Sequence, residues 1–255
     1  MKIIQLNGWC GRLNGPLSEF IKDEQPDILC MQETFAPHPT IPRTFQDQYC
    51  FVDETITAGG FGYNFFAPVW GLEMAGSLID VGNIILSKYP LSAQATSHTY
   101  NHYYIKKSSQ DSLPNTRAWQ ACQVELPNGK QLSVANYQGY LTPEGSMGDE
   151  ITIKTMQKVR DGLSLLPKPL IFCGDLNVNP KSPALKVLDS LGLINLTIRE
   201  RVKTTLSPVH RAPLAARNSV ACDYIFVSED IQVNKFQVSD TIVSDHKALI
   251  LEFDI

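Results

Sequence analysis

The sequence has no long apolar run and little net charge. No stretch approaches the roughly 20 apolar residues that cross a bilayer, and Met1 to Trp9 lack the apolar run after a basic start that marks a secretory signal. Twenty-two basic and 26 acidic residues leave a net charge of −4, which excludes a global cationic field for nucleic acid but not a local basic patch. We therefore expect a cytoplasmic protein without a membrane span.

Closely spaced cysteines are missing as well. The chain has six cysteines, none in a Cys-x-x-Cys pair, and several lie inside apolar runs such as Asp27–Met31 and Ile171–Cys173. This spacing argues against a cysteine-ligated metal cluster. We expect buried free thiols, which are typical of a reducing compartment.

The chain contains no linker, internal repeat or low-complexity tract, so residues 1–255 are expected to form a single domain. Asn128-Gly129 between two apolar runs predicts a hairpin turn. The expected strands are Lys2–Leu6, Ile28–Met31, Asn83–Ser87, Trp119–Leu126, Gln131–Ala135, Leu170–Cys173, Tyr224–Ser228 and Ala248–Phe253. The expected helices are Pro16–Glu24, Gly148–Leu166 and Ser182–Leu191. This order predicts an α/β protein with two packed sheets and helices outside them.

Acidic and amide side chains follow two of the expected strands. One apolar strand ends on Glu33, and another runs into Gly174-Asp175-Leu-Asn177, where the glycine permits a close approach of backbone. An ionised Asp175 can accept a proton from a metal-activated water, and Asn177 can donate to a phosphate oxygen without adding charge. The alternatives are a solvated Glu33 and a turn that satisfies only its own backbone.

A second group of polar residues lies toward the C-terminus. Asp223 opens one strand, and the adjacent pair Asp245-His246 precedes another. Neighbours on an extended chain point to opposite sides, so Asp245 and His246 are expected to differ in role, one binding metal and one facing substrate. A histidine beside a scissile phosphate works best when a carboxylate holds its other nitrogen, and Asp223 is the candidate for that carboxylate. The alternative for His246 is an ordinary core or surface histidine.

Together these motifs resemble the endonuclease/exonuclease/phosphatase superfamily, the group of deoxyribonuclease-I-like phosphoesterases. The matching motifs occur in family order from Asn7 to His246: Asn7, Met31-Gln-Glu33-Thr, Gly174-Asp175-Leu-Asn177, Asp223-Tyr and Ser244-Asp245-His246. The resemblance implies a four-layer α/β/β/α sandwich of two mainly antiparallel sheets with outer helices. It implies an active site at one edge of both sheets.

The resemblance also implies roles for these residues. Mg²⁺ (or Mn²⁺) would be held mainly by Glu33, with Asn7 and Asp245 nearby, a ligand set that suits a hard cation. Asp175 would activate the attacking water, while His246 paired with Asp223 would stabilise charge on the phosphoryl group. The implied substrate-binding residues are Asn177, Asn136, Gln138 and Arg117.

One position departs from the family pattern. Many members carry a second histidine on the strand that corresponds to residues 132–140, and here Gln138 takes that place. Glutamine can donate a hydrogen bond but cannot act as an acid. Tyr137 or Tyr140 is a candidate substitute, as in repair-type members. The departure predicts weaker leaving-group assistance or a different substrate.

The substrate is less defined than the reaction. The segment Arg199–Arg217 contains five basic residues and one acid, and it borders either the site or solvent. Aromatic residues in Phe61–Phe66 and at Trp70 either stack on a ligand or pack internally. Three hypotheses remain: a monomeric phosphodiesterase acting on DNA or RNA, a phosphoesterase for a small molecule or lipid headgroup, and a phosphate-binding protein without turnover.

Overall fold

Two β-sheets, whose central strands are rich in branched apolar residues, form the framework of the molecule. The computed structural model describes residues 1–38, 49–74, 76–107, 115–142 and 145–255. In these residues the first sheet has the order β12 (Gln232–Val238), β13 (Leu249–Asp254), β1 (Lys2–Asn7), β2 (Ile28–Phe35), β4 (Ser77–Ser87), β3 (Tyr63–Met74) and β6 (Ile105–Lys106). The second sheet has the order β10 (Ile194–Asn195), β11 (Asp223–Val227), β9 (Leu170–Asp175), β8 (Gln131–Gln138), β7 (Arg117–Glu125) and β5 (Leu91–Tyr100). Both sheets are mixed, with antiparallel pairs in the majority.

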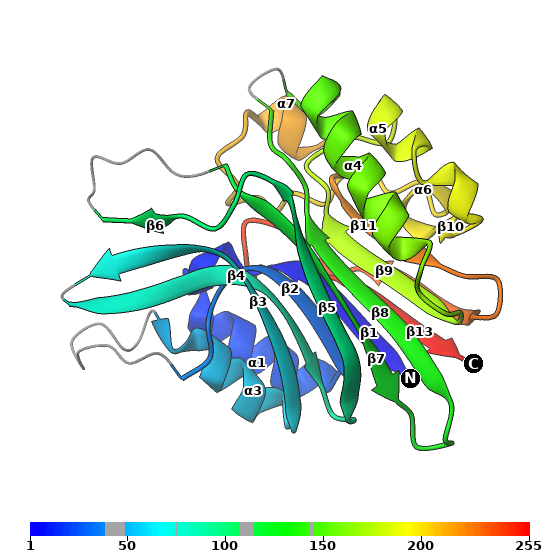
Figure 1. Cartoon of the computed structure of the whole chain (residues 1–255), viewed down its shortest axis with the longest axis horizontal. Coiled ribbons are helices and arrows are strands. Elements are labelled where there is room, and N and C mark those ends of the chain that lie inside the picture. Colours follow the sequence, from blue (N-terminus) through cyan, green and yellow to red (C-terminus); the bar gives the residue numbers. More distant parts are fainter. Residues whose placement is uncertain (39–48, 75, 108–114, 143–144) are drawn as a thin grey trace.

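Helices cover the outer face of each sheet. Helices α1 (Asn14–Glu24) and α3 (Phe51–Gly59) lie on the first sheet, whereas α4 (Glu150–Leu163) and α5 (Pro183–Lys186) lie on the second (Figure 1). The remaining short helical elements are η1 (Trp9–Gly11), η3 (Asp189–Leu191), α6 (Leu196–Arg199) and α7 (Leu214–Arg217). This arrangement confirms the four-layer α/β/β/α sandwich.

Three apolar clusters fill the spaces between these layers. One joins α1 and α3 to the first sheet, one lies between the sheets, and one joins the second sheet to α4 and α5. The middle cluster contains the β1 residue Ile3, the β9 residue Cys173 and the β13 residue Phe253, all fully buried. All six cysteines are free; four are buried as predicted, whereas Cys10 and Cys50 are half-buried. No helix in the described ranges combines the length and apolarity needed to cross a membrane.

Most expected elements are present, with differences at their ends. The expected helix Gly148–Leu166 is shorter, because Asp149 forms a capping box with Thr152 that begins α4 at Glu150. The expected helix Ser182–Leu191 is divided into α5 and η3. Ser182 caps its start, and Gly192 ends it in the left-handed conformation at φ 63°.

A chain of buried amides joins the two sheets behind the strand ends. Gln5 on β1 donates to Gln32 on β2 (2.9 Å), and Gln32 donates across the interface to Asn136 on β8 (2.6 Å). Asn136 donates in turn to the backbone carbonyls of Met31 (2.9 Å) and Ile84 (3.1 Å). Because polar groups buried without partners are costly, these bonds fix the register of one sheet on the other.

The substitution Asn136→Ala should lower the free energy of unfolding by about 3 kcal/mol, since it removes two buried hydrogen bonds to carbonyls and the acceptor of the Gln32 amide. Chemical denaturation measures the change. Asn128→Ala, in the exposed β7–β8 turn, is the matched control and should cost about 0.5 kcal/mol. Equal losses in the two variants would contradict a structural role for the amide chain.

Candidate active site

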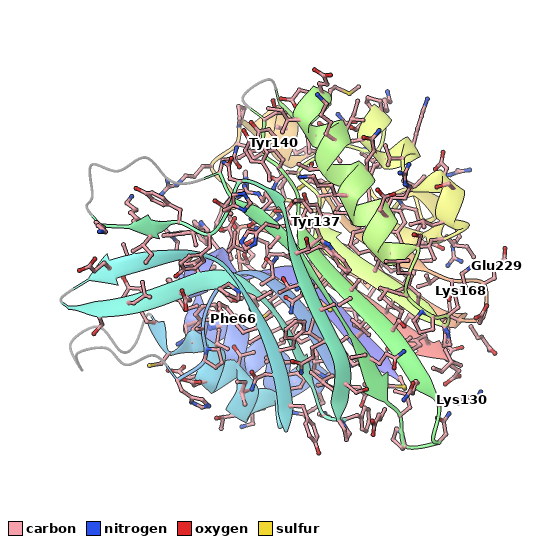
Figure 2. All side chains as sticks on the ribbon, in the orientation of Figure 1. Phe66, Lys130, Tyr137, Tyr140, Lys168 and Glu229 are labelled. Atoms are coloured by element: carbon pink, nitrogen blue, oxygen red, sulfur yellow. The ribbon has the colours of Figure 1, made fainter. Side chains whose placement is uncertain are left out.

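The candidate site lies where strands of both sheets end at one edge of the sandwich. The C-terminal ends of β1, β2, β8 and β9 meet the start of β11 there. In Figure 2, Tyr140, just beyond β8, marks this end of the hairpin β7–β8, and Lys130 marks the opposite end. Residues distant in sequence are thereby brought together, because Asp175 pairs in register with both Gln138 and Asp223.

Glu33 is aimed into the site by an irregularity in β2. The pairing of β2 with β4 shifts register between Met31 and Thr34, and Glu33 has a positive φ of 51°. Such bulges turn a side chain out of the regular alternation of a strand. The Oε1 atom of Glu33 accepts hydrogen bonds from the amides of Asn7 (3.0 Å) and Gln138 (2.7 Å). Two neutral donors therefore hold this carboxylate.

Asp175 is fixed by the tight backbone contact of the residue before it. A Cβ atom on Gly174 would lie 2.1 Å from the Tyr137 carbonyl oxygen, so only glycine fits. The Asp175 carboxylate accepts from the Asn7 amide (3.0 Å) and from the backbone N–H of Asn177 (3.1 Å). Asn177 itself has φ 55° and donates its side-chain amide to the Gly139 carbonyl (3.1 Å).

His246 is held by Asp223, the carboxylate expected for it. The Nδ1 atom lies 2.9 Å from Asp223 Oδ2, and the other ring nitrogen, Nε2, lies 4.0 Å from Asp175 Oδ2. Asp223 also accepts from the Gln5 amide (3.1 Å) and from the Thr205 hydroxyl. The amide chain between the sheets thus ends on the carboxylate that orients the histidine.

Burial and like charges shift the pKa values of these groups. Burial raises the pKa of Asp175 to about 7; nearby Asp223 and Glu33 raise it too, while His246 and Asn7 oppose the shift. Burial alone would lower the pKa of His246, but Asp223 and Asp175 outweigh it and raise the pKa well above its ordinary value. Burial also raises the pKa of Asp245. The histidine is therefore an imidazolium near neutral pH.

Asp245 and His246 converge, so the expectation that they point to opposite sides was wrong. Their ligand atoms and that of His210 all lie within 4.8 Å of one another. The cause is local structure: β13 begins only at Leu249, and His246 makes an isolated bridge to Leu206 instead of lying in an extended strand.

His210 is a site residue that the motifs do not reveal. Its Nε2 atom lies 3.9 Å from Asp245 Oδ2, and its ring stands edge-on to His246 at 5.5 Å. Ser207 ties this loop to the motif by donating to the carbonyls of Asp245 (2.8 Å) and Ser244 (2.7 Å). Within the sequence, only an isolated histidine in the basic segment signalled it.

Two residues expected at the site take other positions. Asn136, expected to bind substrate, is fully buried with its amide used inside the protein, so it supports the strands instead of reaching a ligand. Tyr137 is also fully buried; it faces the cluster beneath α4, and its hydroxyl lies 3.0 Å from that of Thr99. Tyr140 packs edge-on against Tyr100 at 4.7 Å.

A pocket of about 530 Å³ opens beside the carboxylates. Its walls include Glu33 and Gln138 from the site and Trp9, Trp70 and Arg117 from around it. Arg117 is anchored by donating to the carbonyls of Gly139 (2.6 Å) and Thr116 (2.7 Å). The pocket therefore combines the aromatic side chains of Trp9 and Trp70 with the cations Arg12 and Arg117, and the Arg12 guanidinium lies 5.2 Å from the centre of the Trp9 ring.

The donor set fits a hard divalent cation. Asp175, Asp223 and Asp245 lie beside the His246 imidazolium, and Glu33 interacts electrostatically with Asp175 and Asp245, so the cluster has more carboxylates than cations. Carboxylate oxygens are the preferred ligands of Mg²⁺ and Mn²⁺. Asn7 was expected to lie near the metal as a ligand, but its side chain is used within the protein. Its amide nitrogen donates to Glu33 and Asp175, and its oxygen accepts from the Trp9 N–H (3.0 Å).

Comparisons with known proteins agree with this geometry. The sequence model of the endonuclease/exonuclease/phosphatase family matches residues 4–246. A family structure from Beutenbergia cavernae is similar at a TM-score of 0.73 and 17% identity over 99% of this chain and 71% of its own. A mannosyl-6-phosphatase from Bacteroides thetaiotaomicron (0.68, 14%) and an AP endonuclease from Archaeoglobus fulgidus (0.65, 16%) are each similar over 100% of both chains. No curated protein matches in sequence.

The substitution Asp223→Asn should lower the pKa of His246, because it removes the charge that contributes most to raising it. Titration of the histidine ring by nuclear magnetic resonance measures the shift, with His246→Gln used to assign the signal. Asp240→Asn, which neutralises an exposed carboxylate paired with Lys247, is the control and should leave that titration unchanged. An unaltered pKa in Asp223→Asn would contradict the pairing.

Proposed function

Because the chain belongs to the endonuclease/exonuclease/phosphatase family, whose members hydrolyse phosphate esters, we propose that it is a divalent-metal-dependent phosphodiesterase, with DNA or RNA as leading substrates. The observation that carries the proposal is the Asp223–His246 pair at 2.9 Å facing Asp175 at one edge of both sheets. The same fold hosts a sugar phosphatase and an AP endonuclease, so the fold alone does not select the substrate.

Glu33 and Asp245 are the residues we propose as metal ligands. A bound Mg²⁺ or Mn²⁺ would supply positive charge to the phosphoryl and leaving oxygens. Asn7 serves as a positioning residue, because its amide holds Glu33 and Asp175 at 3.0 Å each. Gln138 is a positioning residue as well, because its amide donates to Glu33 at 2.7 Å. This donor is therefore directed at a carboxylate and not at a leaving group.

Asp175 and His246 perform the proton and charge steps in this proposal. A carboxylate whose pKa is raised to about 7 is a stronger base than an ordinary aspartate, and it would accept the proton of the attacking water. His246, held at Nδ1 by Asp223, would donate from Nε2 to a phosphoryl oxygen. Asn177 and Arg117, on the same rim, would bind the remaining phosphoryl oxygens.

One alternative has an observation in its favour. The pocket beside Glu33 is lined in part by Trp9 and Trp70, aromatic side chains that suit an apolar or planar group on a small phosphate ester. Hydrolysis rates on plasmid DNA, bis-p-nitrophenyl phosphate and inositol phosphates would separate the two substrate classes. Metal binding without hydrolysis of any of them would favour a phosphate-binding protein.

Mn²⁺ or Mg²⁺ should raise the thermal unfolding temperature relative to EDTA, because a ligand bound only to the folded state stabilises it, by about 2.7 kcal/mol at 100 times Kd. Glu33→Gln should abolish most of this shift. Glu229→Gln, exposed at the far side of the second sheet in Figure 2, should retain it. A metal-induced shift of equal size in Glu33→Gln would exclude Glu33 as a ligand.

Asp175→Asn and His246→Gln should each lower kcat on bis-p-nitrophenyl phosphate by about 10²-fold or more, the usual contribution of a positioned acid or base. Steady-state kinetics with saturating Mn²⁺ tests this. The exposed α4 variant Asp161→Asn should keep the activity of the unmodified protein. Full activity in Asp175→Asn would refute the proposed mechanism.

A further inference from the structure

A second pocket, of about 590 Å³, lies outside the carboxylate cluster. It is bounded by the segment that follows β9, the end of α6, and the residues that precede β11. Three basic side chains, Lys181, Arg201 and Lys203, line it, and none of its described lining residues is acidic. We call this cavity the basic pocket.

The cations of the basic pocket have no protein partners among the described residues. Within the described ranges, the side chains of Lys181, Arg201 and Lys203 make no hydrogen bond or ion pair, although the neighbouring Arg199 pairs with Glu200 at 2.8 Å. Three like charges around one cavity repel one another unless an anion neutralises them. The arrangement therefore favours an anionic ligand.

The walls of the basic pocket are continuous with the catalytic strands. Thr197, which lines it, donates its hydroxyl to the main-chain carbonyl of Asp223 (3.1 Å). The Val220 carbonyl, on the same wall, accepts from Thr205 (3.1 Å), whose hydroxyl donates to the Asp223 carboxylate. Asn179, another lining residue, follows the Asp175 motif directly. The pocket thus adjoins the Asp223 side of the site.

We propose that the basic pocket binds a second phosphate group of the substrate, one that flanks the scissile phosphate along a polyanionic chain such as a nucleic-acid strand. The inference rests on the proposed phosphodiesterase function and extends it. The cluster at the scissile position is acidic, so it repels a polyanion, and an anion-binding surface beside it offsets that repulsion.

A similar cavity provides a matched control. It measures about 470 Å³, is lined by Lys130 and Lys168, and has no acidic residue among its described lining. Figure 2 places both lysines at the end of the second sheet opposite Tyr140 and hence away from the site. Removing two positive charges from either cavity changes the net charge of the protein equally, so only position distinguishes the two double variants.

The first experiment measures binding of a fluorescent single-stranded oligonucleotide by anisotropy from 50 to 200 mM salt, in an Asp175→Asn background that prevents turnover. Arg201→Ala with Lys203→Ala should weaken binding and reduce the slope of log affinity against log salt by about 1.4, the value for two phosphate contacts on a single strand. Raising the salt from 50 to 200 mM should therefore reduce the affinity of the double variant about sevenfold less than it reduces the affinity of the parent protein. Lys130→Ala with Lys168→Ala should retain the original slope. Equal slopes in the two double variants would overturn the proposal.

The second experiment measures hydrolysis of bis-p-nitrophenyl phosphate, which has a single phosphate and cannot reach both positions. With Asp175 intact, the Arg201/Lys203 double variant should keep its kcat/KM. A large drop would show instead that the substitutions disturb Asp223, and it would remove the support for a phosphate site. If the protein hydrolyses this substrate but Arg201→Ala with Lys203→Ala does not change oligonucleotide binding, the assignment of the pocket is wrong and the proposed function is retained.

A free anion is the other source of the same chemistry. Isothermal titration with inorganic phosphate tests it: binding that depends on Arg201 and Lys203, together with unchanged oligonucleotide affinity, would overturn the assignment to substrate. Oligonucleotide binding that depends on these residues, in a protein that hydrolyses no phosphodiester, would retain the pocket and reject the proposed function. The two failures are therefore distinguishable.

Discussion

Repulsion among four carboxylates is the constraint on which the rest of the site depends. Glu33, Asp175, Asp223 and Asp245 come from four separate segments and meet where burial already penalises charge. Two responses are visible in the molecule. Burial, with the charges of Asp223 and Glu33 adding to it, raises the pKa of Asp175 to about 7, and Asp223 and Asp175 raise the pKa of His246 well above its ordinary value. The carboxylates still outnumber the one imidazolium, and this excess favours an additional cation.

Apart from His246, which pairs with Asp223, the side chains that hold these carboxylates add no charge of their own. Amides of Asn7, Gln138 and Gln5, and hydroxyls of Thr205 and Ser244, donate to them. Among the described residues, no lysine or arginine forms an ion pair with any of the four. A lysine in the same place would neutralise the cluster and exclude a metal. Neutral donors fix the positions of the oxygens and leave the negative charge available.

The sequence predicted those parts of the site that depend on local order. Glu33 follows an apolar run in β2, Asp175 ends the apolar strand β9, and Gly174 marks a close backbone approach, so each is visible in a short stretch of residues. Contacts across the interface are different. Asn136 lies on the same strand face as Gln138, yet it lies deeper between the sheets, where no ligand reaches. Strand alternation gives the face of a residue but not its depth.

His210 is the converse case, a residue that lies at the site but could not be predicted from the sequence. Its loop reaches the site through bonds from Ser207 to the Ser244–Asp245 backbone, a contact between segments over 30 residues apart. The Ala212 N–H donates to its Nδ1 at 3.0 Å, which holds the ring with Nε2 at 3.9 Å from Asp245 Oδ2. No periodicity or motif encodes such a pairing.

Substrate choice depends on what surrounds this arrangement, because the carboxylates and their donors specify a reaction and not a molecule. The two cavities differ in chemistry: the one beside Glu33 is lined in part by Trp9 and Trp70, and the one beyond Asp223 is lined by Arg201 and Lys203, whose side chains have no partner among the described residues. A compact ester would engage only the first. A substrate that spans both needs a planar or apolar group on one side of the scissile phosphate and further negative charge on the other, and a polynucleotide has both.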